Sequence, residues 1–141
     1  MTVDIRTFVP TDEAAVVRLW ESAGLTRPWN DPHRDIERHR AVWPDLLLVA
    51  EEDSAVVGSV MAGYDGHRGW LYYLASDPAH RGRAIGRALV EEAERRLLDL
   101  GCPKVQLMVR RDNESVLGFY DALGYERFDV GLTGKRLIPD L

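Results

Sequence analysis

One stretch of the chain combines cations with residues that have almost no side chain. Residues 80–87 read His-Arg-Gly-Arg-Ala-Ile-Gly-Arg, and no acidic residue occurs between Asp77 and Glu91. The segment before this stretch is apolar and the segment after it is amphipathic, which predicts a strand followed by a helix. The first amides of a helix have no partner within it and lie at the positive end of its dipole. Loop amides and arginines together therefore predict a binding site for an anion.

Pyrophosphate is the anion that suits this site, because the small residues let a ligand approach the main chain closely. Other common phosphate-binding patterns are absent. The chain has no G-x-x-x-x-G-K-[ST], and no G-x-G-x-x-G opens an N-terminal βαβ unit. The alternative is a glycine-rich turn whose arginines are solvated. The strand before the stretch and the helix after it favour the anion site.

The composition limits the classes of protein to which the chain can belong. Its 141 residues include 18 Lys and Arg and 23 Asp and Glu, a formal net charge of −5, which argues against a general nucleic-acid binder. A chain of this length buries enough surface for one core, so we expect a single domain over residues 1–141. No apolar run is long enough to cross a bilayer, so we expect no membrane partner.

The cysteine and histidine patterns bear on metals and on the compartment. Cys102 is the only cysteine, which excludes an internal disulfide and a multi-cysteine zinc site, and a buried structural role suits it better than a nucleophilic one. The four histidines lack paired ligand spacing, so we expect no metal. Asp4 and Arg6 stand where a secretory signal would need an apolar stretch. A cytoplasmic location is the simplest expectation.

Hydrophobic periodicity and turn residues divide the chain into short strands and helices. Strands are predicted at residues 3–8, 46–51, 55–64, 70–76, 104–110, 125–130 and 135–138. Helices are predicted from Thr11 to Gly24 and at residues 32–42, 83–100 and 114–123, with Thr11 and Asp31 as N-caps. The helix at 83–100 would turn one apolar face inward, made of Ile85, Leu89, Ala93, Leu97 and Leu100. Because the elements do not alternate strictly, we expect an α/β (α+β) fold with a mixed, mostly antiparallel sheet flanked by helices.

Residues 81–86 carry a resemblance to a known family. The pattern Arg81-x-x-Ala84-x-Gly86 resembles the Q/R-x-x-G-x-G/A signature of the GCN5-related N-acetyltransferases, the GNAT superfamily, with Ala84 where the family usually has glycine. Residues 74–78 resemble the end of the family's fourth strand, and residues 112–115 and 119–125 resemble its later N-x-x-(x)-FY-x-x-x-GF block. Three further fragments are similar to the small bacterial YpeA-type acetyltransferases, at residues 27–32, 65–69 and 101–104. The resemblance therefore covers nearly the whole chain.

The resemblance implies a GNAT-like sheet that splays between its fourth and fifth strands, with acetyl-CoA as co-substrate in the opening. The pyrophosphate would rest on the amides of residues 81–86, and the pantetheine arm would pair with the backbone at Leu74 and Ser76. The amide near Leu74 would stabilise the negative charge that develops on the thioester oxygen. The cofactor-binding residues implied in this way are Leu74, Ala75, Ser76, Arg81, Gly82, Arg83, Ala84, Ile85, Gly86, Asn113 and Tyr120.

Tyr120 falls where the family often places a tyrosine near the coenzyme sulfur, so the resemblance implies that it is the catalytic general acid. The alternative is core packing beside Phe119 and Tyr125. Asn113 would contact the pantetheine or the diphosphate, or would simply cap the following helix. No general base is assigned, because each candidate is more typical of a surface or turn position. These candidates are Asp31, Glu51, Asp65 and His67.

The resemblance thus implies an N-acetyltransferase that moves the acetyl group from acetyl-CoA to a primary amine by direct attack in a ternary complex. Two alternatives stay open: a non-catalytic regulatory module that binds coenzyme A, and a nucleotide-binding protein that uses the same anion site. The acceptor would be a small molecule, a protein N-terminus or a lysine, and residues 25–43 do not select among them. A homodimer is compatible with the sequence but is not indicated by it.

Overall fold

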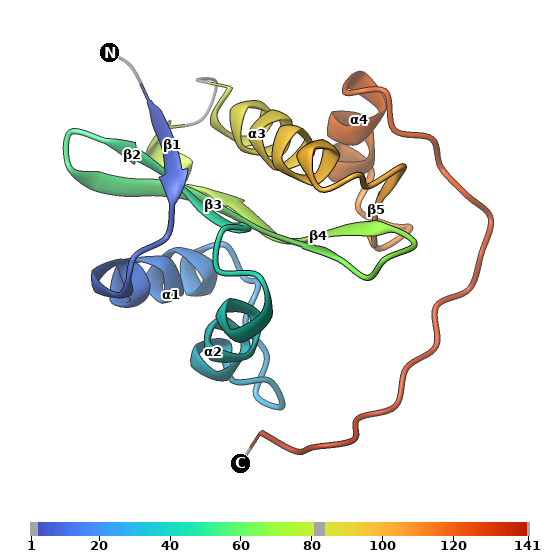
Figure 1. The fold of residues 1–141 in the computed structure, drawn as a ribbon, viewed down its shortest axis with the longest axis horizontal. Helices are drawn as coiled ribbons and strands as arrows, with labels where there is room; N and C mark the ends of the chain where they lie inside the picture. Colours follow the sequence, from blue (N-terminus) through green and yellow to red (C-terminus); the bar gives the residue numbers. More distant parts are fainter. Residues whose placement is uncertain (1–2, 81–83, 141) are drawn as a thin grey trace.

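The structure, a computed structural model, describes residues 3–80 and 84–140. Within these residues, five strands form one sheet in the order β1–β2–β3–β4–β5 (Figure 1). The strands are β1 (Asp4–Thr7), β2 (Leu47–Glu52), β3 (Ala55–Tyr64), β4 (Gly69–Ser76) and β5 (Val105–Leu107). The helices are α1 (Glu13–Ser22), α2 (Pro32–Val42), α3 (Ile85–Asp99) and α4 (Glu114–Ala122), with short 3-10 turns η1 (Pro10–Asp12) and η2 (Pro78–His80). The predicted mixed sheet with flanking helices is confirmed.

The sheet is antiparallel except at the edge formed by β5. Strands β1 to β4 pair antiparallel with their neighbours, whereas β5 pairs parallel with β4. The parallel contact consists of the pairs Gly69↔Val105, Trp70↔Gln106 and Leu71↔Leu107. β5 ends there, short of the predicted range, while β4 continues to its C-terminal residue. The expected splay between the fourth and fifth strands is therefore present.

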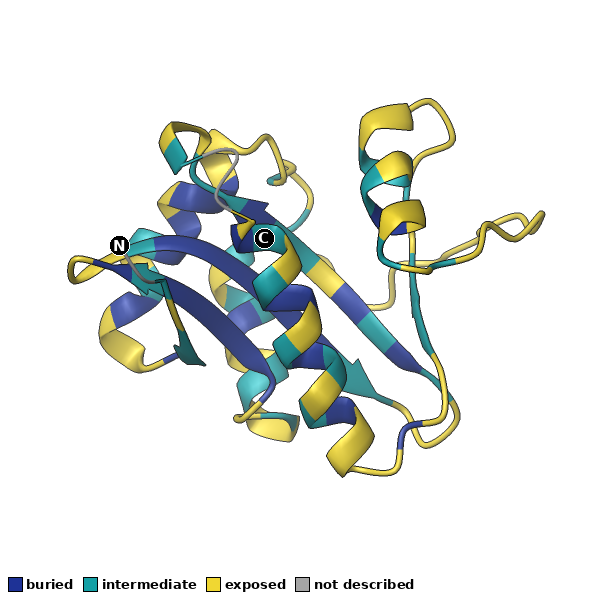
Figure 2. Cartoon of the chain, turned by 90° about the horizontal axis from the view of Figure 1, so that it is seen from above, coloured by how far each residue is buried: buried dark blue, intermediate teal, exposed yellow. Residues whose placement is uncertain are grey.

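The sheet separates two apolar cores. On β2, Leu48 belongs to the core on the α3 side, whereas Leu47 and Val49 belong to the core on the α1 side. This alternation is what a strand buried on both faces requires, and Figure 2 shows the middle of the sheet as buried. α3 lies very close to β3, because a Cβ atom added to Gly58 would lie 2.8 Å from Ile85 Cγ2.

Several local signals in the sequence correspond to the structure. Asp31 caps α2, and its side chain accepts a hydrogen bond from His33 N at 2.9 Å. Asp53 and Ser54 have φ values of 50° and 65° and turn β2 into β3, as the predicted hairpin requires. Gly101, with φ of 85°, follows the end of α3 in the left-handed conformation expected of a helix-ending glycine.

Two details of the helices differ from the prediction. α1 begins at Glu13, because a 3-10 turn precedes it, and it is Asp12 rather than Thr11 whose side chain accepts the amide of Val9, at 2.8 Å. Leu100, predicted to face inward, is 48% exposed. It follows the last turn of α3, where the helix has passed the core that buries the other apolar residues of that face.

The strands predicted at 125–130 and 135–138 are absent from the described chain, which is extended and exposed after α4. The side chains of this segment do not decide whether it pairs with β5. Arg127 instead forms an ion pair with Asp121 of α4 at 2.6 Å, and this contact holds the segment against the helix. The prediction of two further strands was therefore wrong.

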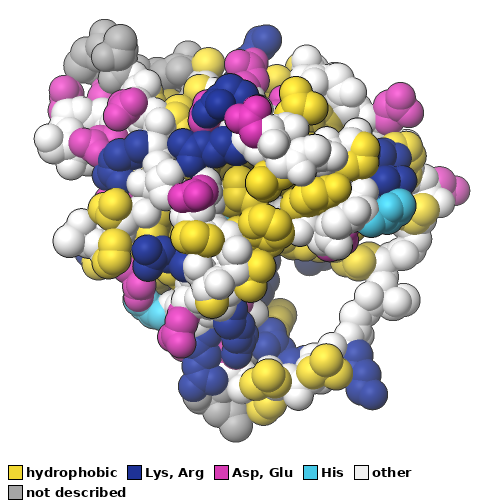
Figure 3. Space-filling model, viewed as in Figure 1, with side chains coloured by type: hydrophobic (Ala, Val, Ile, Leu, Met, Phe, Trp, Pro, Cys, Tyr) yellow, Lys and Arg dark blue, Asp and Glu magenta, His cyan; other side chains and the backbone are white. Residues whose placement is uncertain are grey.

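The C-terminal segment is fixed again near its end. Asp140 accepts hydrogen bonds from Asp31 N and from the Arg38 guanidinium, both at 2.8 Å, beside the start of α2. In Figure 1 the segment runs around the outside of the molecule from α4 to α2. The space-filling view shows an opening between the middle of this segment and the body of the protein (Figure 3). The segment thus connects two distant elements without joining the sheet.

Candidate active site

The second half of β4 carries the coenzyme-binding residues predicted at positions 74–76. Leu74 packs with the core on the α3 side, whereas Ala75 lies in the core on the α1 side. Ser76 lies opposite Gly58 of β3. On the other edge of this half of β4, the described residues supply no strand. A main-chain edge is therefore available to a ligand that carries amide groups.

A β-bulge in β4 changes the direction of this edge. β3 and β4 are in register at Met61↔Tyr72 and again at Ser59↔Ala75, so one residue of β3 faces two residues of β4. Tyr73, within the bulge, has φ of 52°, which is rare for a bulky residue. Tyr72 and Tyr73 both line a cavity of about 430 Å³ beside α2. Sequence reasoning missed this bulge, and no glycine or proline marks it.

The side chain of Tyr73 is held at its ring and at its hydroxyl. The ring stacks on Trp20 of α1, with ring centres 3.8 Å apart. The hydroxyl donates a hydrogen bond to Asp35 Oδ2 at 2.6 Å and accepts one from Asn30 Nδ2 at 3.0 Å. Burial and the hydrogen bond to Asp35 both raise the pKa of Tyr73, so this hydroxyl stays protonated. These contacts join α1, α2 and the loop before α2 to the bulge.

The first turn of α3 has the features of an anion site. Ala84, at the N-cap, has φ of 56° and provides no side-chain cap, and Ala88 N is the first amide to bond within the helix, to Ala84 O. The amides between these two residues have no partner in the helix, and the first turn carries no acidic residue. The preceding part of the predicted loop, Arg81, Gly82 and Arg83, lies outside the described residues.

The side chains that follow Ala84 have structural partners. Ile85 is buried between α3 and β3. Gly86 allows α4 to pack closely, because a Cβ atom there would lie 3.3 Å from Phe119 Cζ. Arg87 forms an ion pair with Glu91 one turn later, at 2.7 Å. The groups left for a phosphate in this turn are therefore chiefly main-chain amides.

Tyr120 lies on the inner face of α4 and is 6% exposed. Its ring makes edge contacts with the rings of Phe119 and Tyr125, with centroids 5.0 Å and 5.3 Å away. The described residues provide no hydrogen-bond partner for its hydroxyl. Burial raises the pKa of Tyr120 to about 12. The ring thus serves the core, as the packing alternative expected, while the hydroxyl remains available as a donor.

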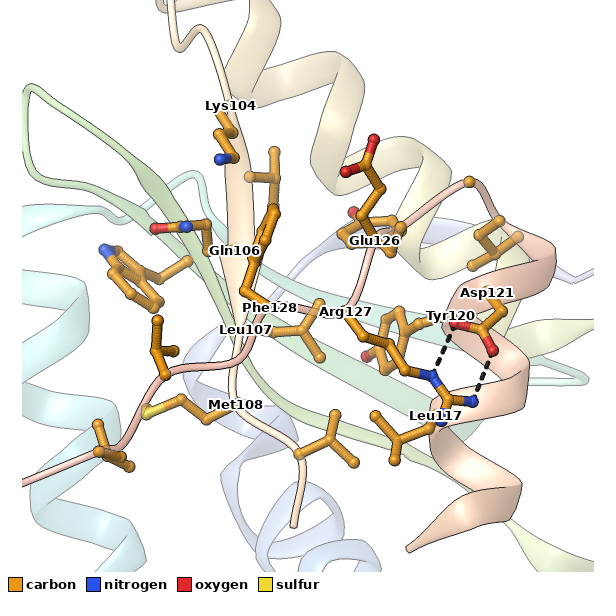
Figure 4. Close-up of a pocket in the computed structure, with 18 of the residues that line it drawn as sticks. Lys104, Gln106, Leu107, Met108, Leu117, Tyr120, Asp121, Glu126, Arg127 and Phe128 are labelled. Carbon is orange, nitrogen blue, oxygen red and sulfur yellow. Dashed lines mark hydrogen bonds and ion pairs between the residues drawn. The ribbon is translucent and has the colours of Figure 1, made fainter. Parts of the chain in front are cut away.

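A larger cavity, of about 1270 Å³, lies between β5, α4 and the first part of the C-terminal segment (Figure 4). Leu107 lies on its β5 side, and Tyr120 and Arg127 also line it. None of the residues predicted at 74–76 or at 84–86 lines this cavity. This cavity follows the free edge of β5 and is therefore distinct from the open edge of β4. Of the predicted site residues that the structure describes, Tyr120 is the one that lines this cavity.

Asn113 occupies the N-cap of α4. Its side-chain oxygen accepts hydrogen bonds from Val116 N at 3.4 Å and from Ser115 Oγ at 3.3 Å. The helix-capping alternative for Asn113 is therefore confirmed. Contact between this exposed residue and a coenzyme stays a prediction.

Comparison with known proteins decides the family. Residues 14–125 match the model of the Acetyltransferase (GNAT) family. The chain belongs to this family. It is 54% identical to Acetyltransferase ECA0875 of Pectobacterium atrosepticum and 51% identical to Acetyltransferase YE1169 of Yersinia enterocolitica, in both cases over 138 residues and 98% of each chain. The resemblance found in the sequence is confirmed.

Solved structures show the same fold. Ard1 from Thermoplasma volcanium superposes with a TM-score of 0.82 at 25% identity, over 92% of this chain and 86% of that chain. AAC(6')-Iy, crystallised with a CoA-containing bisubstrate analog, superposes with a TM-score of 0.80 at 19% identity, over 98% of this chain and all (100%) of that chain. The chain is thus an acetyl-CoA-dependent GNAT acetyltransferase, an acyltransferase of class EC 2.3.1. The uncapped amides of α3 and the open edge of β4 fit this co-substrate.

Three of the four candidates for a general base in this acetyltransferase have structural roles. Asp31 caps α2, and Glu51 forms an ion pair with an arginine of β1 at 2.5 Å. Asp65 accepts hydrogen bonds from Arg68 N and His67 N at 2.7 Å and 2.8 Å, and these lower the pKa of Asp65. His67 is exposed in the same turn. The geometry singles out none of the four as a base.

The remaining expectations concern metals, membranes and the cysteine. Among the residues described, no group of three or more His, Cys, Asp and Glu side chains could hold a metal ion. No helix in this part of the chain combines the length and the apolar character needed to span a bilayer. Cys102 is buried, with Sγ at 2.8 Å from the position of a Cβ atom on Gly69, so it packs between α3 and β4.

Proposed function

We propose that this acetyltransferase transfers the acetyl group of acetyl-CoA to a primary amine, by direct attack within a ternary complex. The observation that carries the proposal is the open edge of β4. Leu74 on that edge packs against the same core that contains Ile85 in the first turn of α3 and Tyr120 of α4. A thioester held along this edge would therefore lie near main-chain donors and near a buried phenol.

The proposal assigns the two ends of acetyl-CoA to two parts of the chain. The pyrophosphate would bind the free amides at the start of α3, together with the arginine-rich loop at residues 81–83. The pantetheine arm would pair with the main chain of Leu74 and Ser76, as an added strand does. Both assignments use backbone groups, so the side chains of Ala75 and Ile85 can pack in the core at the same time.

The chemistry would be completed by one amide and one phenol. The amine nitrogen attacks the thioester carbon, a C–N bond forms, and the C–S bond breaks. The amide of Leu74 would donate a hydrogen bond to the carbonyl oxygen, on which negative charge develops. Tyr120 would give its proton to the departing sulfur, and the proton lost by the amine passes to water, which restores that of Tyr120. The products are the N-acetylated amine and coenzyme A.

The burial of Tyr120 sets a condition on this proton transfer. Its pKa of about 12 exceeds the ordinary thiol value of about 8.5, a difference worth roughly 5 kcal/mol if the sulfur were in water. Desolvation also raises the pKa of a thiol, which narrows the difference. The transfer therefore requires that the sulfur and the phenol share one dry environment.

The acceptor must lose a proton before it attacks. At pH 7 this costs about 4.6 kcal/mol for a lysine-like amine with pKa near 10.4, but only about 1–1.4 kcal/mol for an α-amine with pKa near 7.7–8. An α-amine would react with water as the relay, whereas a lysine would need a dedicated base. Since the geometry singles out none of the four candidate bases, the cost favours an amine of low pKa.

The binding half of the proposal is tested by placing a carboxylate in the predicted anion loop. A Gly82→Glu variant would repel the pyrophosphate and should weaken acetyl-CoA binding, measured by calorimetry, by more than tenfold. A Gly134→Glu variant, which adds the same charge at an open position of the C-terminal segment, serves as the control. Equal affinity of wild type and Gly82→Glu would contradict the assignment of the loop.

The transfer half is tested with a panel of primary amines and detection of the acetylated products by mass spectrometry. The panel should include N-terminal peptides, lysine peptides, polyamines, amino acids and aminoglycosides. Acetylation of at least one amine is expected. Tight binding of acetyl-CoA without acetylation of any amine would instead support the regulatory module.

A further inference from the structure

The peptide group between Tyr73 and Leu74 is held from inside the protein by a chain of two hydrogen bonds. The indole Nε1 of Trp20 donates to Ser59 Oγ at 2.8 Å, and Ser59 Oγ donates to the carbonyl oxygen of Tyr73 at 2.9 Å. Trp20 and Ser59 are both 0% exposed. No water competes for these bonds, so they hold their direction firmly.

The direction of that carbonyl fixes the direction of the amide on the same peptide. The chain has no cis peptide bond among its described residues, so the C=O of Tyr73 and the N–H of Leu74 point in opposite directions. The carbonyl points toward Ser59 of β3 and Trp20 of α1. The amide of Leu74 therefore points away from them, toward the side of β4 that β5 leaves open.

The bulge needs this support. Tyr73 has φ of 52°, and a bulky residue persists in that conformation only where its surroundings hold it. Stacking on Trp20 and the hydrogen bond to Asp35 fix its side chain, but neither prevents the Tyr73–Leu74 peptide plane from rotating. The bond from Ser59 acts on the peptide itself.

We propose that Ser59, oriented by Trp20, is a positioning residue for acetyl transfer. It holds the Tyr73–Leu74 peptide so that the amide of Leu74 faces the thioester oxygen. Because a donor on the carbonyl polarises the whole peptide, it also makes that amide a stronger donor. This inference rests on the proposed function, which assigns the Leu74 amide to the developing negative charge.

The test replaces Ser59 and measures the carbonyl of the bound co-substrate. In a Ser59→Ala variant, the turnover number should fall by about 10-fold to 100-fold. This fall is no larger than the one that commonly follows removal of a direct oxyanion donor. Affinity for acetyl-CoA should stay within about twofold, since a single amide contact changes. The infrared band of ¹³C-labelled acetyl-CoA should lie at lower frequency than in solution when bound to wild type, and move back toward the solution value in Ser59→Ala.

Two further variants separate positioning from stability. Leu47→Ala also removes atoms from the core that contains Trp20, but Leu47 lies opposite Met61 rather than Ser59, so this variant should lower the melting temperature without moving the infrared band. Ser59→Cys keeps the volume of the side chain but supplies only a weak donor, so it serves if Ser59→Ala does not fold. A folded Ser59 variant with an unshifted band and a turnover number within twofold of wild type would overturn the proposal.

The two proposals fail in different ways. If wild type acetylates no amine, the proposed function fails, but the band of bound acetyl-CoA still reports whether Ser59 sets the strength of the amide. If wild type does not bind acetyl-CoA, the ¹⁵N resonance of Leu74 in the free protein provides the readout. A change at Leu74 in Ser59→Ala no larger than at other β4 amides would then overturn the positioning role.

Discussion

Tyr120 joins a packed ring to a hydroxyl that has no partner among the described residues. The burial that fixes the ring also raises its pKa to about 12. The hydroxyl therefore keeps its proton over the whole range in which amines lose theirs. Such a group would supply a proton at any physiological pH, and its effect on the rate should appear only when it is removed.

A Tyr120→Phe variant should acetylate its amine at least about 100-fold more slowly than wild type, because general acids commonly contribute that much. Affinity for acetyl-CoA should change little, since the ring remains. Steady-state rates and calorimetric binding measure the two effects separately.

Tyr125→Phe is the matched control for this change. Tyr125 is a half-buried neighbour whose hydroxyl already donates a hydrogen bond to Glu94 at 2.6 Å. It should lose stability but little rate. Equal rates for Tyr120→Phe and wild type would leave Tyr120 with a packing role alone.

The pH dependence of the rate follows from the same pKa. A phenol is a donor below its pKa, so a pKa of about 12 predicts no loss of activity from Tyr120 between pH 6 and pH 10. Over that interval kcat/KM should rise as the amine deprotonates, and then level off. A descending limb below pH 10 that disappears in Tyr120→Phe would show that the phenol ionises far earlier than its burial implies.

The sequence indicates a role for Tyr120 but gives no sign of the bulge at Tyr73. Tyr120 belongs to a recognisable block with Phe119 and Gly124, so the resemblance alone suggests a role for it near the coenzyme. The bulge at Tyr73 depends on Trp20 and Asp35, which are distant in the sequence and become neighbours only in the fold. A run of apolar residues in a strand gives no local signal for such a change of direction.

At the scale of elements, the start of α3 has a residue type that does not suit its backbone conformation. Ala84 adopts φ of 56°, a conformation that glycine adopts freely and alanine does not. The family usually has glycine at this position. The strain stays local, because the helix that follows is well packed from Ile85 onward.

Ala84→Gly should therefore stabilise the protein by about 0.5–1 kcal/mol, the relief of left-handed strain less the added entropy of the unfolded chain. Urea denaturation measures the difference. Ala88→Gly, in the same helix but with helical geometry, should instead cost about 1 kcal/mol. A loss of stability in both variants would mean that Ala84 is not strained.

Elements set by local signals were predicted well, and those set by their partners were not. The hairpin at Asp53 and Ser54 and the cap at Asp31 depend on neighbouring residues, and both are present. The extent of β5 and the pairing after α4 depend on which chain lies alongside. The side chains of a segment such as residues 125–130 cannot show whether a partner strand is there.

At the scale of the whole molecule, the sheet is covered on both faces but is incomplete along one edge. β5 covers the first residues of β4 and leaves the rest of that edge without a strand among the described residues. A ligand that pairs with this edge would connect β5 to the part of β4 that β5 leaves unpaired. Its binding should therefore stabilise the entire fold and not only the residues it touches.

Acetyl-CoA at about 100 times its dissociation constant should add about 2.7 kcal/mol to stability, which corresponds to a rise of roughly 8–10 °C in melting temperature for a chain of this size. Differential scanning fluorimetry measures the shift. ATP and NAD, at equal concentration, should give much smaller shifts. A larger shift with either nucleotide would favour the nucleotide-binding alternative.

The buried cysteine has a practical consequence. Cys102 is the only thiol of the chain, and its sulfur is packed beneath Gly69 at 5% exposure. Sulfhydryl reagents such as aromatic disulfides would reach it only when the protein opens. The enzyme itself would therefore give little background signal in a colorimetric thiol assay. Each thiol detected during turnover would correspond to one molecule of coenzyme A released.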